Sequence, residues 1–225
     1  MLDKIIIMLT HNDRTVPNAQ EIFDSCKDLP IKKWGFKDVG MAPDDMFRLC
    51  QTMKAAGKET FLEVVTYTEE ECMRGAKLAR DCGFDYLLGT IYFESVLNFV
   101  RLNGLKYCPF VGEVSGSPSI LEGSLEGMLK QEEMFASKGV YGIDLLGYRY
   151  TQGDPNVLSA EFIKGSRLPV VLAGSIASEA RIDLVKKMNP WCFTMGSALF
   201  TDAFGKGGVK ENLEYVVGYL QKISD

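Results

Sequence analysis

The sequence contains one histidine, His11, in 225 residues. Zinc and iron sites are commonly built from several histidines, and one histidine cannot supply such a site. We therefore expect a protein that works without a metal or another cofactor. A magnesium ion bound by carboxylates needs no histidine, so that option stays open.

Paired cysteine motifs, an excess of basic charge and long apolar runs are also absent. The six cysteines include no C-x-x-C pair, which predicts reduced thiols. A net charge of −5 argues against a nucleic-acid partner, because nucleic-acid binding favours a basic face. No apolar run approaches the length of a membrane-spanning helix, and the N-terminal stretch MLDKIIIMLTHND has too short an apolar core for a signal peptide. We expect a cytoplasmic protein that binds neither nucleic acid nor membrane.

Strand-like apolar runs recur along the chain at a nearly even spacing, and each is followed by a stretch with helical spacing. The runs begin near Lys4, Lys32, Thr60, Phe84, Lys106, Val140, Leu168 and Trp191. Such alternation predicts a parallel sheet with right-handed crossovers. Eight units use the whole chain, so we predict a single domain over residues 1–225, an α/β protein closed into a (β/α)8 barrel.

An open doubly wound sheet is the rival fold. That fold usually carries a glycine-containing phosphate loop after its first strand. The segment that follows Ile7, MLTHNDRTVPN, contains no glycine. The barrel is therefore the favoured architecture.

The most informative stretch covers residues 168–200, LPVVLAGSIASEARIDLVKKMNPWCFTMGSALF. One apolar run ends at Gly174 and Ser175, and the next ends at Gly196 and Ser197. Glycine leaves the backbone N–H groups accessible, and N–H groups and hydroxyls converging at a helix start favour an anion. The pattern predicts a phosphate site after two neighbouring strands. The alternative is that both glycines only make tight turns between strand and helix.

The segments Ala173-Gly174-Ser175 and Met195-Gly196-Ser197-Ala198 resemble the last quarter of the phosphate-binding (β/α)8 barrels. That superfamily includes phosphoribosyl isomerases, indole-glycerol-phosphate synthase, and sugar-phosphate epimerases and decarboxylases. In those families the loops after strands seven and eight bind the substrate phosphate. The resemblance implies the same role for these loops here, although many relatives carry a second glycine where this chain has Ser175. Outside residues 168–200 the likeness is one of architecture only.

Four charged residues lie late in otherwise apolar strands: Lys37, Glu63, Glu113 and Asp144. A charge in such a position is costly unless it is paired or used, and reactive groups of barrels lie at the carboxyl ends of strands. A lysine facing carboxylates in a partly dry pocket is a candidate acid/base set. Each residue also has a structural interpretation. Lys37 could pair with Asp38 at the surface, and Glu63 could be a structural partner of Lys37. Glu113 could stabilise the loop after it, and Asp144 could anchor a neighbouring loop.

Two enzyme chemistries fit these groups, and Arg149 could bind a substrate carboxylate or a second phosphate. One chemistry is proton transfer beside a carbonyl group, as in isomerases, epimerases and decarboxylases of sugar phosphates. The other is a lysine imine, as in class I aldolases. Aldolase barrels typically carry that lysine on strand six, where this chain has Asp144.

We therefore expect an enzyme that acts on a small phosphorylated sugar-like metabolite as an isomerase, epimerase or lyase. The alternative is a non-catalytic phosphometabolite-binding barrel or a subunit that needs a partner, because a fold alone does not prove activity. The sequence allows a homodimer and leaves the oligomeric state open.

Overall fold

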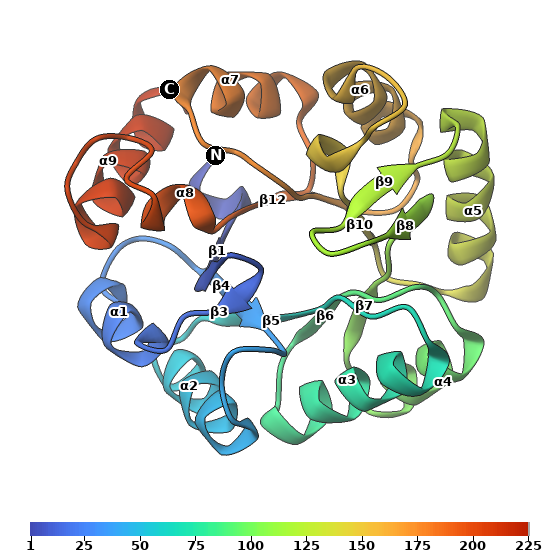
Figure 1. The fold of residues 1–225 in the computed structure, drawn as a ribbon, viewed down its shortest axis with the longest axis horizontal. Helices are drawn as coiled ribbons and strands as arrows, with labels where there is room; N and C mark the ends of the chain where they lie inside the picture. The colour runs from blue at the N-terminus through green and yellow to red at the C-terminus, as the bar shows by residue number, and fades with distance from the viewer. Residues whose placement is uncertain (225) are drawn as a thin grey trace.

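The computed structural model describes residues 1–224, and its core is one ring of eight parallel strands (Figure 1). The strands are β1 (Ile5–Met8), β4 (Lys33–Lys37), β5 (Glu59–Val64), β6 (Tyr86–Gly89), β7 (Lys106–Cys108), β10 (Ile143–Leu145), β11 (Val170–Leu172) and β12 (Cys192–Met195). Each pairs in parallel with its neighbours in chain order, and β1 lies between β12 and β4. The ring closes between β7 and β10, where Asp144 N donates to Pro109 O at 3.0 Å. The predicted (β/α)8 architecture is confirmed.

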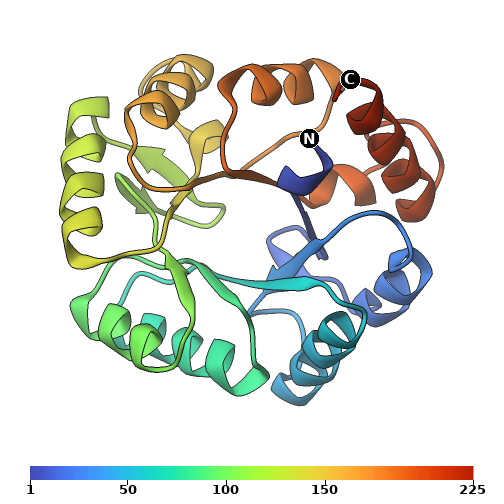
Figure 2. The ribbon, with the colours of Figure 1, turned by 180° about the vertical axis from the view of Figure 1, so that it is seen from behind.

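The helices surround this ring, as both views show (Figures 1 and 2). They are α1 (Ala19–Cys26), α2 (Pro43–Ala55), α3 (Glu69–Cys82), α4 (Glu94–Leu102), α5 (Leu125–Lys138), α6 (Pro155–Gly165), α7 (Glu179–Met188), α8 (Ser197–Phe200) and α9 (Val209–Lys222), with short 3-10 turns η1 (Leu2–Lys4) and η2 (Gly147–Arg149). Local sequence explains many of their ends. Pro43 opens α2, the Ser178 hydroxyl accepts from Arg181 N at the start of α7, and Gly83 and Gly139 end α3 and α5 in the left-handed conformation. None of the helices in residues 1–224 is long and apolar enough to span a bilayer.

Side chains alternate between the inside and the outside of the ring, as the period of two along a strand requires. In β1, Ile5 and Ile7 belong to the large core between strands and helices, whereas Ile6 and Met8 face the barrel axis. The axial cluster consists of Ile6, Met8, Phe61, Tyr86, Leu88, Cys108, Val171 and Cys192, with Tyr141 and Trp191 packed against it. These side chains fill the barrel below the strand ends, so the inward positions at the carboxyl ends are left for polar residues.

Two short antiparallel hairpins interrupt the regular alternation, and the sequence pattern did not predict them. One pairs β2 (Thr10–His11) with β3 (Arg14–Thr15), and the other pairs β8 (Glu113–Ser115) with β9 (Ile120–Glu122). In Figure 1 both lie over the ring. The strand that was expected to begin near Lys106 and to carry Glu113 ends early, at Cys108, because Pro109 cannot donate a ladder hydrogen bond and Gly112 turns the chain with φ of 82°.

Candidate active site

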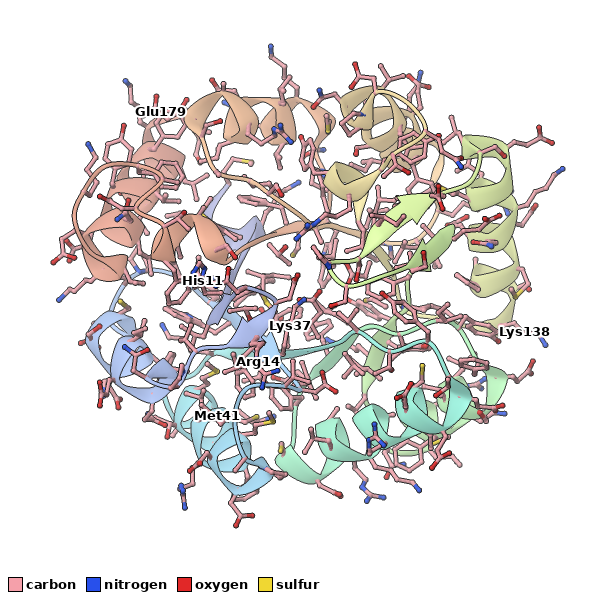
Figure 3. All side chains as sticks on the ribbon, in the orientation of Figure 1. His11, Arg14, Lys37, Met41, Lys138 and Glu179 are labelled. Carbon is pink, nitrogen blue, oxygen red and sulfur yellow. The ribbon has the colours of Figure 1, made fainter. Side chains whose placement is uncertain are left out.

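A cavity of about 240 Å³ opens at the carboxyl ends of the strands. Seven of the predicted site residues line it: Lys37, Glu63, Arg149, Gly174, Ser175, Gly196 and Ser197. In Figure 3 Lys37 lies near the middle of the ring, whereas Lys138 and Glu179 lie at its outer rim. The barrel thus gathers residues from β4, β5 and the segments after β10, β11 and β12 around one space.

Lys37 and Glu63 are neighbours across two strands. They pair in the register of β4 and β5, so both side chains point the same way, and Lys37 Nζ lies 3.6 Å from Glu63 Oε1. Only 9% of the Lys37 side chain and 12% of the Glu63 side chain are exposed. Lys37 therefore faces inward, and the alternative of a surface pair with Asp38 is wrong.

The β2–β3 hairpin adds a residue to the site that the sequence interpretation had not selected, Asp13. Asn12 and Asp13 form its two-residue turn with φ of 49° and 56°, the left-handed pair that a type I′ turn requires. Asp13 Oδ1 accepts a hydrogen bond from Lys37 Nζ at 2.9 Å and lies 4.0 Å from Arg149 Nη2. An Asn-Asp pair directly after the first strand is the signal that could have indicated this hairpin.

Asp144 is buried in the middle of β10, with 1% of its surface exposed. It does not line the cavity, and its Oδ1 has no hydrogen-bond partner among residues 1–224. Burial raises the pKa of Asp144 well above its usual range, and the Glu63 charge raises it further against the opposing effect of Lys37. The environment of the buried Asp144 carboxyl group thus favours its protonated form.

The pKa values of Lys37 and Asp13 shift in the directions that favour their ionised forms. Burial alone would lower the pKa of Lys37, but Glu63 and Asp13 outweigh burial and raise it. Burial alone would raise the pKa of Asp13, but the hydrogen bond from Lys37 and the charges of Lys37 and Arg149 lower it. The site therefore holds a charged lysine among carboxyl groups.

The two Gly-Ser segments lie side by side because β11 and β12 are paired, with Val171 opposite Cys192. Gly174 and Ser175 both have positive φ, 98° and 36°, and the cavity is also lined by the backbone that follows, at Ile176, Ala177 and Ala198. A Cβ at Gly196 would lie 3.0 Å from Thr10 O, so glycine allows this segment to approach the end of β1. The predicted proximity of the two segments is confirmed, and their binding of phosphate stays a prediction.

Of the two remaining predicted site residues, Arg149 lines the cavity and Glu113 does not. Arg149 ends η2, lines the cavity and packs beside Gly174, where an added Cβ would contact Arg149 Cγ at 3.5 Å. Glu113 is exposed in β8 and does not line the cavity, because the strand that was expected to carry it inward ends at Cys108. Placing Glu113 at the end of a barrel strand was wrong.

Four residues with hydroxyl groups that the sequence had not indicated also line the cavity: Thr10, Ser119, Thr194 and Thr201. Thr10 Oγ1 is buried and has no hydrogen-bond partner within residues 1–224. Over the same part of the chain there is no group of three His, Cys, Asp or Glu side chains arranged to hold a metal ion. His11 stacks on Phe200 with ring centroids 5.9 Å apart.

No protein-family model matches the sequence, and a search of curated proteins finds no match. Solved structures do match. The 3-hexulose-6-phosphate synthase of Salmonella typhimurium has a TM-score of 0.71 at 14% identity, over 97% of this chain and 99% of that one. The chain is a (β/α)8 barrel.

Two further solved structures are similar to this barrel over most of both chains. The tryptophan synthase alpha chain of Legionella pneumophila subsp. pneumophila has a TM-score of 0.67 at 10% identity, covering 99% and 92%. The N-acetylmannosamine-6-phosphate 2-epimerase of Clostridium perfringens has a TM-score of 0.64 at 9% identity, covering 97% and 92%. These similarities confirm the (β/α)8 fold.

Proposed function

We propose that this barrel is an enzyme that acts on a small phosphorylated sugar-like metabolite by acid/base chemistry. One observation carries the proposal: the inward pair Lys37–Glu63 and both Gly-Ser segments line the same cavity. The names of two similar structures include a hexulose phosphate and a mannosamine phosphate. They support the substrate class, while the charged pair supports catalysis.

The phosphate would bind against the backbone after β11 and β12. Successive N–H groups in a turn can form a concavity suited to an anion, and Gly174 and Ser175 form such a turn with φ of 98° and 36°. Ser175 and Ser197 supply hydroxyl donors at the same edge of the cavity. Arg149, beside Gly174, adds a positive charge that could bind the phosphate or a second acidic group of the substrate.

Lys37 and Glu63 would then act on the part of the substrate that lies deeper in the cavity. The Glu63 carboxylate would remove a proton from a carbon beside a carbonyl group, and the Lys37 ammonium would stabilise the negative charge that develops on the oxygen. Isomerases, epimerases and several lyases share such a step, so the proposal covers all three. Neither Glu113 nor Asp144 lines the cavity, so we assign no direct contact with the substrate to either.

The test is a panel of pentose and hexose phosphates followed by proton NMR in deuterated water, which detects both new products and deuterium entering beside a carbonyl. We expect Lys37→Met and Glu63→Gln each to reduce the rate by about 100-fold or more. Lys33 and Glu59 supply matched controls. They pair on the same two strands at 3.4 Å, at the other end of the barrel, so Lys33→Met and Glu59→Gln should leave the rate nearly unchanged.

Full turnover in both Lys37→Met and Glu63→Gln would show that these roles are wrong. Assays with EDTA and with added magnesium would test the predicted independence from a metal.

A second candidate is a non-catalytic barrel that binds a phosphorylated metabolite. This candidate is favoured because Lys37 already contacts both Asp13 and Glu63, so these charged groups pair with one another without a substrate. Thermal shift with the same panel would detect binding under either proposal. Binding without product or deuterium exchange would favour the second candidate.

A further inference from the structure

Asp13 lies outside the residues to which the proposed function gives a role, yet it makes the shortest contact to Lys37 Nζ, at 2.9 Å. Its carboxylate also lies 4.0 Å from Arg149 and lines the cavity. The side chain is 41% exposed, so no packing requirement explains a carboxylate there. The contact joins residues 24 positions apart in the chain.

The hairpin that carries Asp13 is fixed to β4 at the position of Lys37 itself. Thr15 Oγ1 accepts from Lys37 N at 2.9 Å and donates to Lys37 O at 2.7 Å. Thr15 N donates to Val39 O at 2.9 Å, and the chain at Gly40 approaches so closely that an added Cβ would lie 2.4 Å from Thr15 O. These contacts set the distance between the hairpin turn and the lysine.

We infer that Asp13 is a positioning residue that keeps Lys37 a charged ammonium aimed into the cavity, so that Lys37 acts as a proton donor and oxyanion partner and not by forming an imine. The inference rests on the proposed function for the catalytic importance of Lys37. Imine formation needs a neutral amine whose lone pair attacks a carbonyl carbon. An ammonium held by a carboxylate has no such lone pair.

Two carboxyl groups contact Lys37 Nζ and favour the ammonium against the effect of burial. Asp13 contacts it from the hairpin at 2.9 Å and Glu63 from β5 at 3.6 Å. Asp38 directly follows β4, and the Arg149 guanidinium lies 4.0 Å from the other side of the contact, at Asp13 Oδ1. Two carboxyl groups thus meet at one lysine within the described part of the chain, and the raised pKa of Lys37 agrees with this geometry.

The test measures the protonation of Lys37 directly, by NMR of the 15N-labelled lysine side chains during a pH titration. The Lys37 signal is identified by its loss in Lys37→Met. Asp13→Asn removes the charge and keeps the turn, since asparagine tolerates positive φ. Glu126→Gln is the control, because Glu126 accepts from Lys130 at 2.7 Å on the exposed side of α5.

We expect Lys37 of the unmodified protein to titrate above an ordinary lysine, whose pKa is about 10.4. Asp13→Asn should lower its midpoint by about one pH unit or more, a tenfold change in proton affinity. Glu126→Gln should leave it unchanged. Thr15→Val, which loosens the hairpin without removing a charge, should lower the midpoint in the same direction.

An unchanged midpoint in Asp13→Asn, or a midpoint below that of an ordinary lysine in the unmodified protein, would overturn the inference. An unchanged midpoint in Thr15→Val would overturn the part given to the hairpin. The titration uses no substrate, so failure of the sugar-phosphate panel would remove the proposed function and leave this result standing.

Discussion

Lys37, Glu63 and Asp144 illustrate how a barrel interior can hold charge at low cost. Two residues before each of them lie Gly35, Phe61 and Gly142, which contact or belong to the apolar axial cluster of Met8, Phe61 and Cys108. An isolated buried charge would be strongly destabilising. Here the ammonium is paired twice, and burial raises the pKa of Asp144, which favours its uncharged form.

Asp38, beside this cluster, gives the residue-scale prediction. Burial raises the pKa of Asp38 to about 6 from an ordinary value of 3.8. A carboxyl group that binds its proton more tightly in the folded state loses stability as pH rises from its unfolded pKa through its folded pKa. We expect Asp38→Asn to remove that loss. The variant should be more stable than the unmodified protein by about 1–2 kcal/mol at pH 7.5, after allowance for partial exposure, and no more stable at pH 3.5.

Urea unfolding at pH 3.5 and pH 7.5 measures this difference. The same difference in unfolding free energy at both pH values would contradict it.

At the scale of the element, the β2–β3 hairpin connects the first barrel strand to the site. Its two-residue turn is a local structure, but its position depends on Thr15 and Gly40, which join it to β4. The β8–β9 hairpin likewise reaches the cavity through Ser119, which Tyr67 Oη contacts at 2.9 Å. Both hairpins thus convert the loops of a regular barrel into walls of the cavity.

Gly40 and Gly57 form a matched pair that tests the first of these contacts. Both have positive φ, 101° and 72°, so alanine is strained at either position. An added Cβ at Gly57 meets no atom within 4 Å, whereas at Gly40 it would lie 2.4 Å from a backbone oxygen. We expect Gly57→Ala to cost about 1 kcal/mol of unfolding free energy and Gly40→Ala about 2–4 kcal/mol.

Urea denaturation of the two variants gives both values. Equal losses would show that the close approach of Thr15 to Gly40 does not contribute to stability. Gly40→Ala should in addition move the Lys37 signal, and Gly57→Ala should not.

At the scale of the molecule, the two ends of the ring differ. The amino-terminal end is closed by Tyr86, Tyr141 and Trp191, with Lys106 Nζ 4.5 Å above the Tyr86 ring. The carboxyl-terminal end is open at the cavity. Pairing also differs around the ring. β4 and β5 pair from Lys33 to Lys37, whereas β7 and β10 have no strand register and are joined by backbone hydrogen bonds from Tyr141 N and Gly142 N to Tyr107 O and from Asp144 N to Pro109 O.

This unevenness predicts the pattern of local opening. Amide protons whose hydrogen bonds join β7 to β10, such as that of Asp144 N bonded to Pro109 O, should exchange with solvent faster than those bonded between β4 and β5. We call this junction of β7 and β10 the seam. Native-state hydrogen exchange followed by NMR measures both sets. Exchange at the seam as slow as exchange in β5 would contradict the prediction.

Much of the fold could be predicted from the sequence, because its determinants are local. Apolar runs of strand length, helical spacing between them, and glycine at the ends of α3 and α5 act over a few residues. The same holds for Lys37 and Glu63, whose charge within apolar strands is visible in the sequence itself. The Gly-Ser segments could be found for the same reason, since neighbouring units of a parallel barrel end at the same edge.

Only the tertiary structure decided which of these groups meet. Strand direction and register place Lys37, and not Asp38, at an inward position. The early end of β7 at Cys108 leaves Glu113 outside the cavity, and a hairpin brings Asp13 to Lys37. Each outcome depends on the distance between elements that are remote in sequence, which is set by closure of the ring and the packing of loops upon it. Local propensity carries no information about such distances, so the sequence determined the barrel and its charged residues, and the folded chain determined the site.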